Sequence, residues 1–151
     1  MAGNKSGPSP AGVVLPKGYR PKKTEEYMNP MQLAYFQRKL LSWRAELLQE
    51  SEETRRELVE ETENTYGTAG DDVDRANDET MKQLELRARD RERKLLAQID
   101  AALGRIEDGT FGYCDITGEP IGLARLEARP IAMRSVEAQE EHENMEKVYS
   151  S

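Results

Sequence analysis

The fold is decided by residues 66–76, which read YGTAGDDVDRA. Gly67 and Gly70 interrupt a long charged helical pattern, because glycine is a poor helix former. Asp71 and Asp72 then favour a new helix, since carboxylates are stabilised at the positive end of the helix dipole. Two long helices joined by so short a break predict an antiparallel hairpin, whose acidic tip lies near residues 66–76.

The segment before the break has the pattern of a helix that begins at Asn29. Asn29 can cap the helix, Pro30 suits its first position, and Gln32 can reach back as in a capping box. Good helix formers continue to about residue 65. Apolar residues recur every three or four positions, as along a coiled-coil seam. They are Leu33, Phe36, Leu40, Trp43 and Leu47.

The segment after the break predicts a second helix, from Asp71 or Asp72 to Asp108, with Gly109 suited to a left-handed cap. With about 35 residues, each helix is roughly 50 Å long, and neither can bury its apolar stripe alone. Pairing the stripes gives a coiled-coil hairpin over residues 29–108, packed best away from the tip. The second stripe consists of Ala76, Met81, Leu84, Ala88, Leu95, Ile99, Leu103 and Ile106, with Arg91 interrupting it.

The remaining chain predicts three smaller parts. Residues 1–28 are rich in proline, which opposes helix, so we expect an N-terminal tail. Residues 109–134 are turn-rich and contain aromatic residues, which predicts two brief strands or a knuckle. Ser135 can cap a last helix within residues 135–151. The predicted fold is therefore mainly α: a long antiparallel coiled-coil hairpin, a small globular knuckle domain and a C-terminal helix.

The composition narrows the classes of function. Charged residues make up 34% and hydrophobic residues 36% of the chain, which suits an elongated helical body with a small core. The net charge of -7 disfavours nonspecific binding to nucleic-acid phosphates. One Cys and one His allow no internal disulfide and no ordinary Cys/His zinc site. Without a long apolar run or a signal peptide, the chain is expected to be cytoplasmic, with no membrane span.

The acidic tip and one arginine are the first candidate sites. Asp71 and Asp74, three residues apart, lie on one helix face. They either only stabilise the helix start or present carboxylates to a cation or a basic surface. Two carboxylates could act on a partner's Mg²⁺ site but would not build a tight site alone. Most basic residues of 87–94 are expected to form surface ion pairs, whereas Arg91 falls on the apolar stripe and is a candidate for partner contact.

Together these features resemble the DksA/TraR family of bacterial RNA-polymerase secondary-channel regulators. The likeness covers nearly everything after about residue 25, and the matching segments are residues 25–29, 71–76, 89–94, 108–114 and 121–130. The family implies a coiled coil that enters the secondary channel of RNA polymerase, with its tip near the catalytic Mg²⁺. It also implies inhibition of stable-RNA promoters and activation of amino-acid biosynthesis promoters in the stringent response, together with guanosine tetraphosphate (ppGpp).

The resemblance assigns roles to individual positions. The matching tip residues are Asp71, Asp74 and Ala76, and Arg91 matches a polymerase contact. The residues that match the ppGpp site are Leu95, Gln98, Arg129 and Gln139. Typical members carry Lys at the second and fourth of these positions, whereas Gln brings no charge to the phosphates. Because Arg129 can still bind phosphate in a bidentate way, we predict a weakened or altered response to ppGpp.

The zinc finger of the family is altered in this chain. Typical members bind zinc through four cysteines, and the corresponding residues here are Cys114, Thr117, Ser135 and Ala138. Thr is a poor zinc ligand, so we expect no zinc and a zinc-finger-like domain held by packing. A structural zinc can supply ~10–16 kcal/mol of folding free energy, which this packing must replace. The chain thus resembles a zinc-independent branch of the family.

Three functions remain open at this point. The first is a regulator that contacts RNA polymerase and ppGpp as a monomer, without catalysis and without specific DNA binding of its own. The second is a transcript-cleavage factor like the Gre proteins, in which Asp71 and Asp74 would be ligands of the polymerase metal. The third is a plain coiled-coil scaffold. The first is favoured, because the tip and residues 121–130 match the family together.

Overall fold

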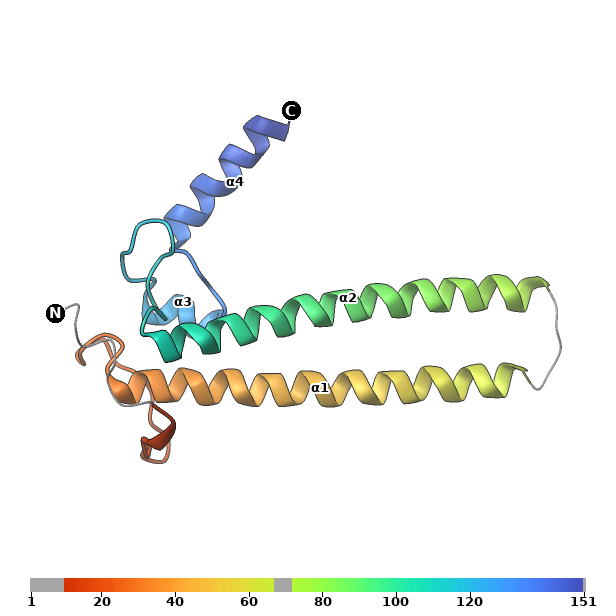
Figure 1. Ribbon diagram of the computed structural model, residues 1–151, viewed down its shortest axis with the longest axis horizontal. Coiled ribbons are helices and arrows are strands. Elements are labelled where there is room, and N and C mark those ends of the chain that lie inside the picture. Colours follow the sequence, from red (N-terminus) through yellow and green to blue (C-terminus); the bar gives the residue numbers. More distant parts are fainter. Residues whose placement is uncertain (1–9, 67–71, 151) are drawn as a thin grey trace. The chain divides into compact units, whose positions relative to one another are not determined.

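The computed structural model describes residues 10–66 and 72–150, which are mainly helical, as predicted (Figure 1). The chain divides into a first unit, residues 1–41 and 99–151, and a second unit, residues 42–98. The predicted break at residues 67–70 and Asp71 lie outside the described residues. The elements are the 3-10 turn η2 (Pro10–Gly12) and the helices α1 (Pro30–Tyr66), α2 (Asp72–Asp108), α3 (Leu123–Ala128) and α4 (Val136–Ser150).

Helix α1 begins where the sequence predicts it. The side-chain oxygen of Asn29 accepts a hydrogen bond from the N–H of Gln32 at 2.9 Å, as an N-cap does. Gln32 Oε1 accepts in turn from the N–H of Met28 at 2.8 Å. This is one residue earlier than in a regular capping box, because the N–H of Asn29 donates to the carbonyl of Glu26. Since the Gln32 side chain is fully buried, the cap also ties the helix start to the core.

The core of the first unit is built from the start of α1, the end of α2 and the knuckle. The rings of Phe36 and Phe111 pack with their centroids 5.6 Å apart. Burial of each large apolar side chain stabilises the fold by about 1.5–3 kcal/mol. The hairpin is therefore packed best at the end away from the tip, as the sequence predicts. The buried apolar side chains of α1, α2 and the knuckle include Ala34, Phe36, Leu40, Ile99, Ala102, Ile106, Phe111, Cys114, Ile121, Leu126, Ile131 and Ala132.

Residues 10–28, which fall in the predicted tail, are packed within the first unit. The ring of Tyr19 meets that of Tyr35 edge to face, with 6.2 Å between centroids. The Tyr19 hydroxyl donates to the carboxylate of Glu25 at 3.0 Å. Burial and the neighbouring Glu25 carboxylate raise the pKa of Tyr19 to about 12. Proline therefore excludes α-helix from this segment, but aromatic side chains still pack it against the unit.

The knuckle, residues 109–134, consists of turns. Among the described residues the only bridge is an isolated antiparallel one between Tyr113 and Pro120, so the two brief strands considered from the sequence do not form. The glycines at 109, 112, 118 and 122 all have positive φ, and the chain turns too often for a longer ladder. The N–H of Ile121 donates to the carbonyl of Gly112 at 2.8 Å, which holds the two limbs together.

Tyr27 ties the N-terminal segment to both limbs of the knuckle. Its hydroxyl donates to the carbonyl of Gly112 at 2.6 Å and accepts from the N–H of Gly122 at 3.0 Å. Its ring meets Tyr113 edge to face, with 5.6 Å between centroids. Met28 lies so close that a Cβ at Gly112 would come within 2.8 Å of its side chain. Gly112 is therefore required for the close approach of these two segments.

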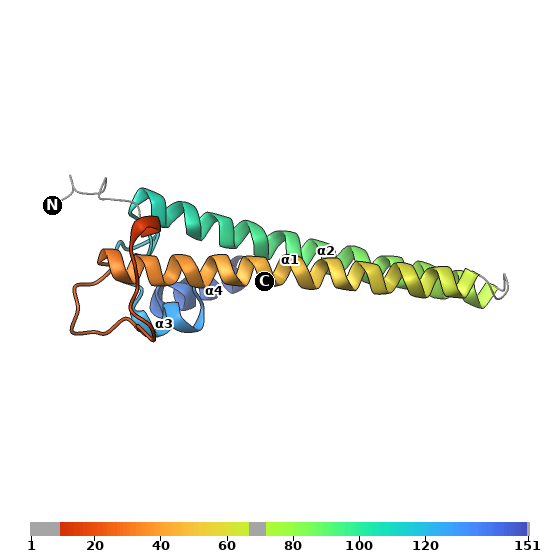
Figure 2. The same cartoon turned by 90° about the horizontal axis from the view of Figure 1, so that it is seen from below.

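The second unit contains the remaining turns of α1 and α2, which lie side by side in Figures 1 and 2. The Ser51 hydroxyl of α1 donates to the carboxylate of Glu92 on α2 at 2.6 Å. None of the side chains that the structure describes in this unit is buried. The apolar stripe thins in this part of the hairpin, and polar contacts take its place.

The position of the second stripe differs from the prediction within this unit. Leu84 is 54% exposed and Arg91 is exposed as well, so placing them on the stripe is wrong. The reason is the repeat of the helix: counted back from buried Ile99, the less exposed positions alternate strictly between steps of four and three residues, as in a coiled-coil heptad, whereas Arg91 and Leu84 each require two successive steps of four. The less exposed positions on that line are Leu95, Glu92, Ala88, Glu85 and Met81.

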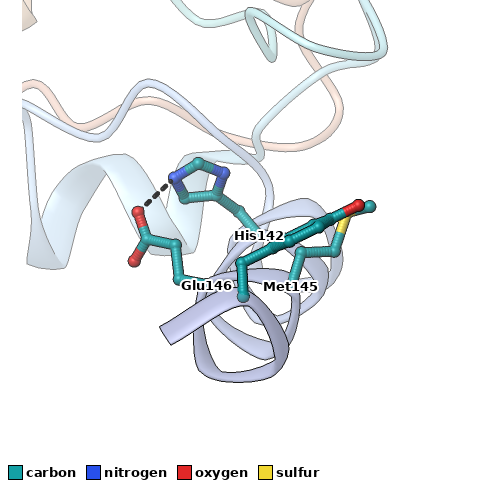
Figure 3. A pocket seen from close by; sticks show the side chains of 4 residues that line it. His142, Met145 and Glu146 are labelled. Atoms are coloured by element: carbon teal, nitrogen blue, oxygen red, sulfur yellow. Dashed lines mark ion pairs between the residues drawn. The ribbon is translucent and has the colours of Figure 1, made fainter. Parts of the chain in front are cut away.

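Helix α4 begins after Ser135, whose hydroxyl accepts a hydrogen bond from the N–H of Ala138 at 3.2 Å, so the predicted cap is confirmed. Figure 3 shows His142, Met145 and Glu146 around a hollow on α4, with His142 Nε2 3.0 Å from Glu146 Oε1. Because one helix supplies the whole lining, the hollow is open surface. Among the described helices, none combines the length and apolar character of a membrane span.

Candidate functional site

The predicted tip residues lie at and near the start of α2. Asp74 belongs to the first turn of this helix, and Ala76, in the second turn, is exposed. The unpaired N–H groups of a first turn attract carboxylates. Asp71 lies outside the described residues, so its approach to Asp74 stays a prediction.

Arg91 projects from α2 in the second unit and is exposed to solvent. Two of its neighbours are engaged in other contacts. Arg89 pairs with Glu85 one turn earlier at 2.5 Å, and Glu92 accepts the hydrogen bond from Ser51. The expectation that Arg89 belongs to a surface ion pair is confirmed, and the exposure of Arg91 suits a contact with a partner.

The four positions matched to the ppGpp site are divided between the two units. Half-buried Leu95 and exposed Gln98 belong to the second unit, whereas exposed Arg129 and half-buried Gln139 belong to the first. The side-chain amide of Gln139 donates to the Glu143 carboxylate at 3.1 Å. A carboxylate therefore already occupies a donor of Gln139 that would otherwise be available to a phosphate.

The segment that carries Arg129 is anchored through its main chain. The N–H of Arg129 donates to the carbonyl of Arg125 at 2.7 Å, and its own carbonyl accepts from the N–H of Ala132 at 3.0 Å. Its φ of −142° is extended backbone, as expected before Pro130. Leu126 of α3 is fully buried. The guanidinium of Arg129 thus stands in solvent on a fixed backbone.

A cluster of Tyr35, Lys39 and Glu127 lies next to this segment. The Tyr35 hydroxyl donates to both carboxylate oxygens of Glu127, at 2.9 Å for Oε2. The ammonium of Lys39 donates to Glu127 Oε2 at 3.0 Å and to the Glu127 carbonyl at 2.9 Å. The sequence offers no signal for this cluster, because Glu127 is 92 and 88 residues from Tyr35 and Lys39 and each residue alone looks like an ordinary surface residue.

The cluster changes the acidity of its members. Burial raises the pKa of Tyr35, and the hydrogen bond and charge of Glu127 add to this, so that it reaches about 12. Partial burial acts to raise the pKa of Glu127. The hydrogen bonds from Tyr35 and Lys39 and the Lys39 charge outweigh burial and lower that pKa. The charge of Arg20 lowers it a little further, so Glu127 is a carboxylate whose charge is already compensated, mainly from α1.

Cys114, the first of the four positions matched to zinc ligands, is buried. Burial acts to raise the pKa of its thiol. Hydrogen bonds from the Thr117 hydroxyl and from the N–H groups of Thr117, Ser135 and Ile116 outweigh burial, and the pKa falls to about 7. The thiol thus lies among polar groups from both segments that carry the four matched positions.

The four residues do not fit a structural zinc ion. Such an ion takes four ligands from Cys, His or carboxylate side chains, and Cys114 is the one residue of that kind among the four positions. The Thr117 hydroxyl accepts from the N–H of Glu119 at 3.2 Å, and the Ser135 hydroxyl caps α4. Ala138 has no donor atom. The chemistry of this donor set therefore supports packing and hydrogen bonding as the means of holding the knuckle.

Comparison with protein families gives two matches that follow each other along the chain. Residues 32–106 match the N-terminal domain of the DnaK suppressor protein DksA. Residues 109–144 match the prokaryotic dksA/traR C4-type zinc finger, although the chain retains one of the four cysteines of that finger. The first match covers the hairpin and the second the knuckle with most of α4.

Individual relatives extend these matches over most of the chain. The RNA polymerase-binding transcription factor DksA of Caulobacter vibrioides is 59% identical over 140 residues, which are 92% of this chain and 96% of that protein. The protein of the same name from Escherichia coli K12 is 48% identical over 114 residues, 76% of this chain and 73% of that protein. The structure of transcription factor DksA2 from Pseudomonas aeruginosa is similar with a TM-score of 0.69 and 38% identity, covering 85% of this chain and 94% of that one. The chain therefore belongs to the DksA family.

Proposed function

We propose that this chain binds RNA polymerase through the secondary channel and regulates transcription initiation, as a cytoplasmic monomer and without catalysis. The observation that carries the proposal is the 59% identity to a curated DksA over 92% of the chain. This relative is named an RNA polymerase-binding transcription factor. Because the likeness includes both the hairpin and the knuckle, it applies to the whole architecture and not to a single module.

The hairpin would deliver the charges of its tip to the polymerase. Asp71, Asp74 and Ala76 would lie near the catalytic centre and alter the stability of promoter complexes. Stable-RNA promoters would be inhibited and amino-acid biosynthesis promoters activated. Arg91 would contact the polymerase, and its exposure on α2 supports this role.

The chain would share ppGpp with the polymerase, but with a weakened response. Arg129 is the charged residue among the four matched positions, and its guanidinium is exposed on an anchored segment. Gln98 and Gln139 bring no positive charge to the phosphates. The amide of Gln139 is also engaged with Glu143, which supports a reduced contribution from α4.

The knuckle would function without zinc. The side chains at the four metal positions are unsuited to the ion, and main-chain and side-chain bonds connect the same two segments: the N–H of Asp115 donates to the carbonyl of Met133 at 2.9 Å, and Arg134 Nε donates to the Asp115 carboxylate at 3.1 Å. We propose that the protein belongs to the zinc-independent members of its family. Such a member would keep its activity when zinc is scarce.

The test is transcription in vitro from a ribosomal promoter, with purified RNA polymerase and with or without ppGpp. Asp74→Asn removes one tip charge and should abolish the promoter effect while binding to polymerase largely persists. Asp78→Asn, the same chemical change one turn along α2, is the matched control and should behave like wild type. If Asp74→Asn behaves like wild type, the chain is a scaffold and the proposed tip mechanism is wrong.

Stalled elongation complexes separate regulation from transcript cleavage. A Gre-like factor would release short 3′ fragments from these complexes, with Asp71 and Asp74 as ligands of the polymerase metal. The proposed regulator should leave the transcripts intact over the same time. The ppGpp part is tested with Arg129→Ala, because a response of full strength that this variant leaves unchanged would contradict it.

A further inference from the structure

The position of Arg129 depends on a short segment that is held at several points. Its main-chain bonds to Arg125 and Ala132 fix the turn that follows α3. On one side, Arg125 Nε donates to the carbonyl of Arg134 at 2.7 Å, which connects α3 to the start of α4. On the other side, Glu127 connects the segment to α1. Among the hydrogen bonds described for residues 127–129, those to α1 all involve Glu127.

Lys39 fixes the orientation of Glu127 through two hydrogen bonds. One ammonium group bonds both the side chain and the main chain of Glu127, at 3.0 and 2.9 Å. It also stands 5.9 Å from the centre of the Tyr35 ring. The Lys39 and Glu127 side chains are 36% and 34% exposed, and such pairs contribute little to stability. Their double attachment nevertheless fixes where the chain leaves α3.

Tyr35, one turn before Lys39 on α1, completes the arrangement. Its hydroxyl donates to both oxygens of the Glu127 carboxylate, and its ring is fixed edge to face on Phe36 at 5.2 Å and on Tyr19 at 6.2 Å. A hydroxyl on so well packed a ring has little freedom. The carboxylate therefore remains directed toward α1.

The same contacts remove an internal competitor for the guanidinium. Glu127 is two residues before Arg129, and a carboxylate released from α1 could reach that guanidinium and pair with it in a bidentate way. It would then occupy the donors that a phosphate needs. Compensation by Lys39 leaves the surroundings of Arg129 more positive and its donors available.

We infer that Tyr35 and Lys39 are positioning residues that act through Glu127 to keep the Arg129 guanidinium available to a polyphosphate anion. This inference rests on the proposed function, because it assigns a supporting structure to the same ppGpp site. It adds two residues of α1 that lie outside the matched positions.

The experiment measures the ppGpp concentration that gives half of the maximal promoter effect in the purified transcription system. Lys39→Met keeps an unbranched side chain that is one atom shorter and removes its charge, and Tyr35→Phe removes only the hydroxyl. Each should raise the half-maximal concentration by about three- to tenfold, equivalent to at most one factor of ten in affinity. The maximal effect and binding to polymerase without ppGpp should stay at the wild-type level. Lys17→Met, at an exposed lysine of the N-terminal segment, is the matched control and should leave the concentration unchanged.

The double variant Lys39→Met with Glu127→Gln distinguishes positioning from loss of structure. Removing the carboxylate removes the competitor, so the half-maximal concentration should return toward the wild-type value. A merely structural role predicts the opposite, because the double variant has lost both partners. An effect of Lys39→Met that the second substitution worsens, or one accompanied by a lower melting temperature and a lower maximal effect, would overturn the inference.

Arg129→Ala separates this inference from the proposed function. If wild type and Arg129→Ala respond equally to ppGpp, the proposed nucleotide site itself is wrong. If Arg129→Ala weakens the response while Lys39→Met and Tyr35→Phe respond like wild type, the site stands and the positioning role is refuted.

Discussion

Replacing Tyr27 by Phe removes one hydroxyl group that joins the N-terminal segment to the knuckle. That hydroxyl donates to the carbonyl of Gly112 at 2.6 Å and accepts from the N–H of Gly122 at 3.0 Å. The ring and its edge-to-face contact with Tyr113 can remain in the variant. The substitution therefore isolates two hydrogen bonds from the apolar packing around them.

The two bonds are not equally replaceable. The Gly112 carbonyl keeps the hydrogen bond from the N–H of Ile121 at 2.8 Å, so it remains satisfied. The N–H of Gly122 loses the acceptor that Tyr27 provides. Loss of one net hydrogen bond costs about 0.5–1.5 kcal/mol, and leaving a buried donor unpaired about 1–3 kcal/mol. Because Gly122 is half-buried, we expect a decrease of about 1–3 kcal/mol in the free energy of unfolding.

Urea unfolding followed by circular dichroism measures this decrease. Tyr149→Phe is the matched control, since it makes the same chemical change on a side chain that is 84% exposed and should stay within about 0.5 kcal/mol of wild type. Amide hydrogen exchange at Ile121 and Gly122 should accelerate in Tyr27→Phe. Equal unfolding energies and equal exchange rates in the two variants would refute the argument that this hydroxyl secures the knuckle.

Three further predictions concern glycine, Cys114 and metal. Gly112→Ala should lower the unfolding free energy by at least ~1–2 kcal/mol, because φ is +92° and the new Cβ would meet Met28. Gly104→Ala, in open space within α2, should raise it by about 1 kcal/mol. Similar unfolding free energies of the two variants in urea would contradict this prediction. With the Cys114 pKa lowered from 9.0 to about 7, the unfolded state binds more protons between these values, so the contribution of the thiolate is complete above pH 9 and is lost as the pH falls through 7. Stability should therefore rise from pH 7 to 9 in wild type, and a rise of the same size in Cys114→Ala would show that other groups cause it. A strong zinc chelator should leave the melting temperature unchanged, and a clear decrease would reveal a structural zinc ion.

The helices and their caps could be predicted because local chemistry determines them. Asn29 and Ser135 both act as caps, as expected for side chains that can accept a bond from an N–H two or three residues on. Asp108, expected as the last residue of the second helix, is the last residue of α2. These signals lie within a few residues of the feature that they determine.

The stripe on α2 could be predicted only in part, because apolar residues do not always mark the buried face. Leu84 and Leu86 are 54% and 60% exposed, whereas Glu85 between them is less exposed and pairs with Arg89. The buried end near Ile99 sets which face of the helix is covered, because its buried side chains contribute more stabilisation than isolated exposed leucines. Only a count backwards from that end in strictly alternating steps of four and three residues gives the correct face.

The cluster around Glu127 had no equivalent signal. Tyr35 and Lys39 meet Glu127 only because α1 and α3 pack together, and the contact joins residues that are 92 and 88 positions apart. Single-sequence patterns describe neighbours along the chain, so contacts of this kind become visible only with the fold.

The lack of buried side chains among the described residues of the second unit affects how genetic data on this protein should be interpreted. Substitutions at residues 42–57 or 75–98 remove little apolar burial, so most of them should leave the amount of folded protein in the cell unchanged. A substitution in these segments that abolishes function is therefore a candidate for lost recognition of a partner. The same loss of function from a substitution at buried Phe36 or Ile99 would first require a measurement of protein abundance, because degradation of the unfolded protein alone could produce it.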